Sequence, residues 1–160
     1  MLFDERKKLS SSFYIIIMNT QNHLRNLQYQ TILERSKQPR NKGKTNPIHQ
    51  YQIGHNPICG DSIELTIKFN QTNQIIEDIK FQGKGCALTI ASADLMAETL
   101  SGKTREEILE IIEKFRQMLK GEIVLSNDLV KLNIFQGVSQ FPIRIKCVLL
   151  SWHALKAALK

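Results

Sequence analysis

The segment GKGCALTIASADLMAETLSGKT, residues 83–104, joins a glycine-containing turn to a helix through one cysteine. The run after Cys86 is rich in Ala, Leu and Met, and it predicts a helix over about residues 87–100 that ends at Gly102. A helix start presents unpaired N–H groups and the positive end of the peptide dipoles, which favour a thiolate over a thiol. Cys86 is therefore a candidate for chemistry. The alternative is a small apolar residue buried where the helix meets a sheet.

Two predicted strands precede this segment. In residues 63–69 apolar and polar side chains alternate, as a half-buried strand requires. A polar connector of hairpin type follows over residues 70–74, and the run IIEDIKFQ predicts a second strand over residues 75–82. The second strand leads directly into the glycine-containing turn.

Helical patterns account for most of the remaining chain. An amphipathic pattern in residues 24–38 ends before Pro39, and residues 104–120 open with a Thr-x-x-Glu capping-box signature. Residues 122–133 fit no single element. Pro142 suits the first position of a last helix, whose apolar stripe is Ile145, Leu149, Trp152 and Leu155.

The net charge of +7 is concentrated near the N-terminus. Residues 1–46 hold nine Lys and Arg against three Asp and Glu, whereas residues 47–160 hold thirteen against twelve. The body of the chain carries no basic stripe of the kind a nucleic-acid reader needs, so we expect no nucleic-acid partner.

The first 23 residues do not connect with the pattern that follows. Their apolar run FYIIIM, residues 13–18, is too short to span a bilayer or to form a signal-peptide core, so no membrane association is expected. We predict an N-terminal extension over residues 1–23 that is disordered or not native, with Met18 as an alternative start. Residues 24–160 then form one domain.

Three cysteines lie far apart in the sequence and cannot all pair with one another. An odd and sparse set indicates a reducing compartment rather than a disulfide framework, and we expect a cytoplasmic protein.

Two nucleotide-binding motifs are excluded. GKGCAL lacks the third glycine of a dinucleotide fingerprint because Leu88 stands there, and GKT at residues 102–104 lacks the earlier glycine of a phosphate-binding loop because Ala97 stands there. A serine or cysteine hydrolase needs a histidine near its nucleophile, and the sequence leaves this open. The four histidines are His23, His49, His55 and His153, of which the last is expected to be solvated or at the edge of the core.

Cys59, Asp61, Cys86 and Cys147 each stand at or near the edge of a predicted element. If these edges converge, three thiolates and one carboxylate form a four-ligand set that suits tetrahedral Zn²⁺. Thiolates also hold iron–sulfur clusters and accept sulfane sulfur from another thiol. Because no CxxC is present, three unrelated buried cysteines remain the alternative.

Four segments together resemble the U-type iron–sulfur cluster assembly proteins, specifically the SufU branch. They are KQPRNKGK, NPICGDSIELTIKF, IKFQGKGCALTIASADLM and QGVSQFPIRIKCVLLSWHAL, and the similarity runs from Leu24 to the C-terminus. In the IscU branch a histidine directly precedes the third cysteine, whereas Lys146 stands here. The additional residues that SufU proteins carry between the second and third cysteines match the region of residues 122–133.

The resemblance implies an α+β fold of the IscU and SufU type, with a small antiparallel sheet of about three strands packed on one side by helices. It also implies one Zn²⁺ held by Cys59, Asp61, Cys86 and Cys147. The same cysteines would hold an iron–sulfur cluster if the protein were instead a scaffold.

The resemblance further implies a SufS-type cysteine desulfurase as partner, with other iron–sulfur assembly proteins downstream. Cys59 is the expected acceptor of persulfide sulfur, and Arg144 could stabilise anionic sulfur or dock the partner, or be an ordinary surface arginine. The expected function is that of a zinc-dependent sulfur carrier, an accessory in sulfur transfer rather than a stand-alone enzyme. The alternatives are a scaffold on which a cluster assembles and a purely structural zinc domain.

Overall fold

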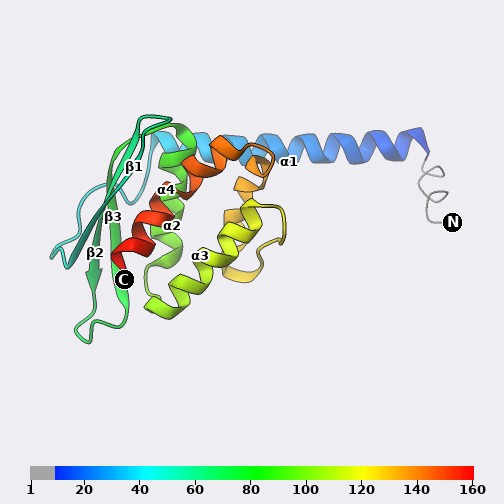
Figure 1. The fold of residues 1–160 in the computed structure, drawn as a ribbon. Helices are drawn as coiled ribbons and strands as arrows, with labels where there is room; N and C mark the ends of the chain where they lie inside the picture. Colours follow the sequence, from blue (N-terminus) through cyan, green and yellow to red (C-terminus); the bar gives the residue numbers. More distant parts are fainter. Residues whose placement is uncertain (1–9) are drawn as a thin grey trace.

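A computed structural model describes residues 10–160 as a three-stranded antiparallel sheet with helices on one face (Figure 1). The elements in chain order are α1 (Ser11–Lys37), β1 (Gln50–Asn56), β2 (Asp61–Phe69), β3 (Ile76–Lys84), α2 (Ala87–Leu100), α3 (Arg105–Leu119), the 3-10 helix η2 (Asn127–Val138) and α4 (Pro142–Ala158). The predicted α+β class is confirmed.

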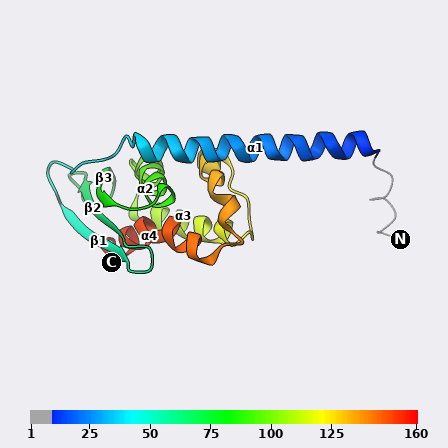
Figure 2. The same ribbon diagram turned by 90° about the horizontal axis from the view of Figure 1, so that it is seen from above.

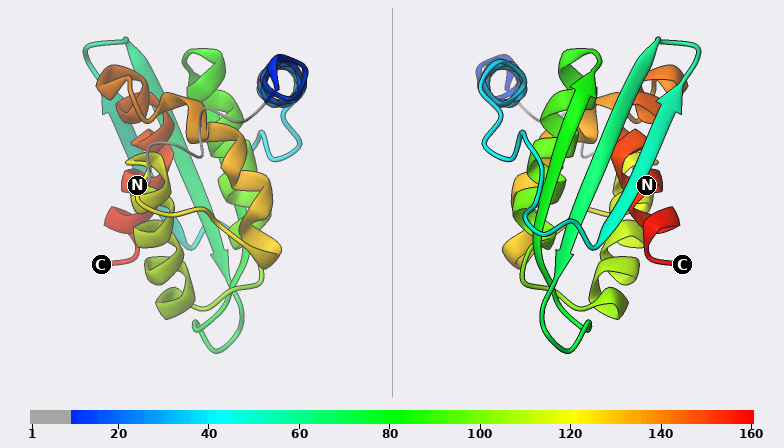
Figure 3. Two further views of the ribbon diagram at one scale, coloured as in Figure 1. Left: turned by 90° about the vertical axis from the view of Figure 1, so that its right-hand side faces the viewer. Right: turned by 90° about the vertical axis from the view of Figure 1, so that its left-hand side faces the viewer.

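The sheet has the order β1-β2-β3, and both pairs of neighbours are antiparallel. The alternation predicted for the central strand β2 is confirmed, because its apolar side chains all point into the core. They are Ile63, Leu65, Ile67 and Phe69, each at most 4% exposed. The opposite face is partly covered by the connection from α1 to β1, where the N–H of Thr45 donates to Thr66 Oγ1 at 2.9 Å (Figure 3).

Helices α2 and α4 form the layer against the sheet, and α3 and η2 pack on their outer side (Figures 1 and 3). Trp152 of α4 is fully buried and stacks on Phe115 of α3 with ring centroids 4.0 Å apart. Its indole N–H donates to Ser92 Oγ at 2.9 Å, and that hydroxyl donates to the carbonyl of Val148 at 2.6 Å. The indole N–H of Trp152 and the hydroxyl of Ser92 are therefore both paired at the α2–α4 contact, as their burial requires.

The predicted helix boundaries agree with the structure at several points. Helix α1 ends at Lys37, before Pro39, and α4 begins at Pro142. The capping box of α3 is present, with Thr104 Oγ1 accepting the N–H of Glu107 and the Glu107 carboxylate accepting the N–H of Thr104. Part of the unassigned region becomes η2, which buries Leu129, Leu132, Phe135 and Val138.

Strand β1 has no counterpart in the pattern analysis of the residues. Its buried positions are Gly54 and Asn56, so it carries no apolar stripe. Gly54 gives α4 close access to the sheet, because a Cβ at this position would lie 3.2 Å from Ala154 Cβ. The packing thus depends on the lack of a side chain rather than on an apolar one.

Helix α1 begins 13 residues before the predicted Leu24 and projects beyond the rest of the molecule (Figure 2). All residues from 10 to 27 are exposed, and only the C-terminal part packs, on α2 and η2. The predicted division into residues 1–23 and 24–160 stays a prediction, and residues 1–9 lie outside the described part of the chain. Within residues 10–160, no helix is both long and apolar enough to cross a membrane.

Asp94 of α2 fastens the end of α1 and the following loop to the core. It is completely buried, and its Oδ2 accepts a hydrogen bond from Arg35 Nη1 at 2.8 Å. Its Oδ1 accepts the backbone N–H groups of Arg40 and Asn41, both at 2.8 Å. A buried carboxylate with this many donors is tolerated because its charge is paired and hydrogen-bonded.

Gly83 permits a close backbone approach at the end of β3. Its φ is +133°, and a Cβ there would overlap the carbonyl oxygen of Ser62 on β2. Gly43 has a similar φ of +141° but faces open space. Both positions therefore have a backbone conformation that favours glycine, but only at Gly83 would a side chain also collide with a neighbouring strand.

We expect Gly83→Ala to lower the free energy of unfolding by about 1–3 kcal/mol more than Gly43→Ala, because only the first adds a backbone overlap. Urea unfolding followed by circular dichroism measures both. Equal losses in the two variants would show that β2 and β3 do not approach this closely.

We expect Asp94→Ala to lower the free energy of unfolding by about 3–5 kcal/mol, because it leaves two backbone N–H groups and Arg35 without their buried acceptor. The matched control is Asp128→Ala, which removes an exposed carboxylate paired with Lys103 at 2.8 Å and should change the urea midpoint little. A similar small change in both variants would contradict the anchoring role of Asp94.

Candidate metal centre

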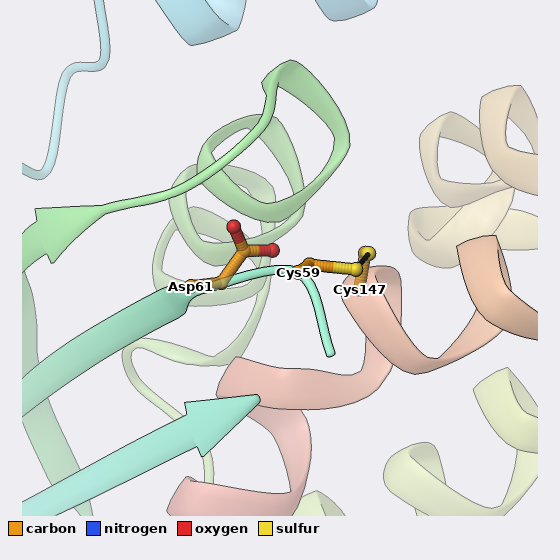
Figure 4. A group of neighbouring side chains, drawn as sticks. All are labelled: Cys59, Asp61 and Cys147. Atoms are coloured by element: carbon orange, nitrogen blue, oxygen red, sulfur yellow. Dashed lines mark hydrogen bonds between the residues drawn. The ribbon is translucent and has the colours of Figure 1, made fainter. Parts of the chain in front are cut away.

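Three predicted ligands meet where β2 begins and α4 starts its second turn (Figure 4). Cys59 lies on the turn between β1 and β2, Asp61 is the first residue of β2, and Cys147 lies on α4. One ligand atom from each lies within 4.8 Å of the others. The sulfur atoms of Cys59 and Cys147 are 3.2 Å apart.

The turn that carries Cys59 is a tight connection between paired strands. Asn56 and Asp61 are register partners, so only four residues lie between them. The side chain of Asn56 accepts the N–H of Ile58 at 3.2 Å, and Gly60 adopts a φ of +70°. This hairpin geometry directs Cys59 across the end of the sheet toward α4.

Cys86 lies beside this group rather than within the 4.8 Å set. It occupies the N-cap position of α2, and its N–H donates to Asp61 Oδ1 at 3.2 Å. Its sulfur is 3.4 Å from Thr89 Oγ1. All three thiols line one largely apolar pocket of about 510 Å³ bounded by α1, η2 and α4. The four-ligand set of Cys59, Asp61, Cys86 and Cys147 therefore stays a prediction, with three of its members already grouped.

Gly85 explains how the start of α2 comes so close to Asp61. A Cβ at this position would lie 2.9 Å from Thr89 Cβ and 3.1 Å from Asp61 Cγ, both below normal packing distances. Together with Gly83, it lets the turn between β3 and α2 place Cys86 next to the first residue of β2. The Gly-x-Gly sequence thus serves close packing rather than phosphate binding.

The three thiols differ in accessibility. Cys59 and Cys86 are exposed, whereas Cys147 is 4% exposed. Burial raises the pKa of the Cys147 thiol above its usual range, and the hydrogen bond with Cys59 and the charge of Cys86 act in the same direction. Cys147 therefore holds its proton at neutral pH in the metal-free chain, and a bound cation has to displace it.

Two basic residues, Arg144 and Lys146, precede Cys147 on α4. Arg144 is exposed and lines the pocket, with its guanidinium carbon 4.7 Å from the ring centroid of Phe141. Lys146 is also exposed. Within residues 10–160, the 4.8 Å group contains no histidine, and His153 is exposed further along α4.

The donor set fits a single metal ion. Two thiolates bound to one tetrahedral Zn²⁺, at about 2.3 Å each, lie about 3.8 Å apart. The 3.2 Å between Cys59 and Cys147 Sγ, and the 4.8 Å limit of the group, bracket this value. Two sulfur atoms and a carboxylate suit Zn²⁺, and the thiolates alone also suit iron–sulfur chemistry. This cysteine and aspartate group could therefore bind a metal.

Residues 27–160 match the family model of the NifU-like N-terminal domain. The chain belongs to this family. One relative is the zinc-dependent sulfurtransferase SufU of Bacillus subtilis strain 168, 42% identical over 140 residues that cover 87% of this chain and 93% of the relative. Another is the iron–sulfur cluster assembly scaffold protein IscU of Streptococcus pyogenes serotype M1, 38% identical over 138 residues that cover 86% and 85%.

Solved structures of NifU-like proteins have the same fold. A putative iron–sulfur cluster assembly scaffold protein for the SUF system, from Fervidobacterium islandicum AW-1, superposes with a TM-score of 0.75 at 37% identity, covering 81% of this chain and 94% of that one. A NifU-like N-terminal protein from Brucella abortus gives a TM-score of 0.73 at 22% identity, which supports the fold alone. The resemblance inferred from the sequence is confirmed at the level of family and fold.

Three residues at the site, Thr89, Arg25 and Tyr29, were not predicted from the sequence. Thr89 touches both Asp61 and Cys86, and its position one turn after Cys86 was the available signal. Arg25 and Tyr29 of α1 line the pocket. Nothing in their local sequence indicates this, because it depends on how α1 packs.

We expect iodoacetamide to label Cys59 and Cys86 of the metal-free protein at least about tenfold faster than Cys147, because Cys147 is buried and its thiol keeps its proton. Peptide mass spectrometry over time, with a thiol-free reductant present, measures the three rates. In denaturant the rates should converge. Labelling of Cys147 as fast as Cys59 in the folded protein would contradict the arrangement described.

Proposed function

We propose that this protein is a zinc-dependent sulfur acceptor that takes persulfide sulfur from a SufS-type cysteine desulfurase and passes it toward iron–sulfur cluster assembly. The observation that carries the proposal is that two exposed thiols and one buried thiol line one pocket, with the Asp61 carboxylate grouped with two of them. The similarity to a protein named zinc-dependent sulfurtransferase supports it.

Cys59 is the proposed acceptor because it is exposed and lies on a turn rather than in a helix or strand. Its thiolate attacks the terminal sulfur of the partner's persulfide. A new S–S bond forms on Cys59, the partner's S–S bond breaks, and the partner's cysteine leaves as a thiolate. The transferred sulfur keeps its proton, and the exchange needs no external oxidant or reductant.

Cys59, Asp61, Cys86 and Cys147 are the residues that would hold the metal. Zn²⁺ bound there would keep the thiols deprotonated and supply no redox chemistry that consumes a persulfide. Arg144, exposed at the pocket, would stabilise the anionic sulfur of the partner's cysteine as it leaves. Three free thiols are compatible with the reducing cytoplasm, where we place the protein.

A cluster scaffold is the second candidate function. A relative named as an IscU scaffold supports it, and the same cysteines would hold an iron–sulfur cluster. Lys146 precedes Cys147 where the IscU branch has a histidine, so this chain lacks the imidazole at that position. We therefore favour sulfur acceptance.

The test mixes the purified protein with a SufS-type desulfurase and L-cysteine. We expect faster alanine production and a persulfide on Cys59 by peptide mass spectrometry, and elemental analysis should find one zinc per chain. Cys59→Ser should abolish the persulfide because the attacking sulfur is gone. Arg144→Ala should slow acceptance, whereas Lys146→Ala, which removes an exposed cation two residues away, should change it less.

No stimulation of the desulfurase and no persulfide on Cys59 would end the proposal. Assembly of a visible-absorbing cluster on the same cysteines in place of zinc would favour the scaffold. A Cys59→Ser variant that fails to fold, beside a parent that accepts no sulfur, would favour a structural zinc domain.

A further inference from the structure

Thr89 lies in the first turn of α2 at the point where two predicted ligands meet. Its side chain is 1% exposed, and its hydroxyl donates to Asp61 Oδ2 at 2.6 Å. The same oxygen lies 3.4 Å from the sulfur of Cys86. One hydroxyl therefore contacts a carboxylate from β2 and a thiol from the N-cap of α2.

The Thr89 hydroxyl and the Cys86 N–H donate one hydrogen bond to each oxygen of the Asp61 carboxylate. Oδ1 accepts the N–H of Cys86 at 3.2 Å, and Oδ2 accepts the hydroxyl of Thr89. Asp61 is 3% exposed, so water cannot readily replace either donor. Each carboxylate oxygen accepts more than one interaction, so both remain able to bind a cation while held in this orientation.

The packing around Thr89 fixes its rotamer as well as its position. Gly85 lies against it so closely that a Cβ there would be 2.9 Å from both Thr89 Cβ and Cγ2. A β-branched side chain has few allowed χ1 values, and this contact restricts them further. The hydroxyl is therefore kept directed at Asp61.

We propose that Thr89 is a positioning residue of the metal centre, whose hydroxyl orients the Asp61 carboxylate and keeps Cys86 beside it. The inference rests on the metal site of the proposed function. Donors behind a metal-binding carboxylate orient it, and their loss typically weakens metal binding about 10–100-fold. A purely structural role would lower the free energy of unfolding of the variants but would leave their zinc affinity and cobalt spectrum unchanged.

Two pairs of variants isolate the hydroxyl. Thr89→Val keeps the shape of the side chain and removes its O–H, whereas Thr89→Ser keeps the O–H. Thr89→Ala and Thr89→Ser differ by the hydroxyl alone, so the comparison stands even if the valine variant does not fold. The matched control is Thr99→Val, since Thr99 is a buried threonine of the same helix whose hydroxyl has no hydrogen-bond partner among residues 10–160.

Zinc affinity is measured by competition with a chromogenic chelator, and the cobalt-substituted proteins are compared by absorption spectroscopy. We expect Thr89→Val and Thr89→Ala to bind zinc about 10–100-fold more weakly and to change the cobalt bands, while Thr89→Ser and Thr99→Val resemble the parent. Val and Ala variants with the parent's affinity and spectrum overturn the inference.

The inference and the proposed function fail in different ways. A parent chain that accepts sulfur but binds no zinc overturns the role of Thr89 and leaves sulfur acceptance standing. A parent chain that binds zinc tightly but accepts no sulfur overturns the proposed function, and the affinities of the Thr89 variants still decide whether the hydroxyl orients Asp61.

Discussion

The Asp61 carboxylate joins the first residue of the central strand to the start of α2, and the candidate centre is built around this junction. It is nearly inaccessible to solvent and accepts the N–H of Cys86 and the hydroxyl of Thr89. A buried carboxylate is costly without such donors, so the fold must bring the N-terminus of α2 to it. Gly83 and Gly85 make this approach sterically feasible. The same junction places Cys86 near the two thiols that come from the β1–β2 turn and α4.

Where a residue's role is set by its neighbours in sequence, the pattern predicted the structure well. The alternation in β2, the capping box of α3 and Pro142 at the start of α4 all depend on local periodicity or local hydrogen bonds. The cysteines at element edges were visible as an unusual placement. That they meet could be inferred only from the family resemblance, because convergence of distant segments has no local signal. The complete ligand set and the sulfur acceptance of Cys59 remain predictions.

Where tertiary packing determines the role of a residue, the sequence pattern did not predict it. Strand β1 has no apolar stripe because its inward positions include Gly54, whose missing side chain is what α4 needs. The role of Asp94 emerges only in the folded chain, where Arg35 and the backbone at residues 40 and 41 reach it. Periodicity placed the start of α1 at residue 24, because the residues before it lack the amphipathic pattern that core packing produces.

Because α1 is held near its C-terminal end, a change of its angle there moves the rest of the helix. Arg35 is held near its C-terminal end, while Arg25 and Tyr29 border the pocket that contains the thiols and the N-terminal half projects freely. Arg25 lies about 15 Å along the axis from Arg35, so a tilt of about 10° at the pivot displaces it by roughly 3 Å. The angle of α1 at this contact therefore affects the width of the pocket opening beside the sulfur atoms.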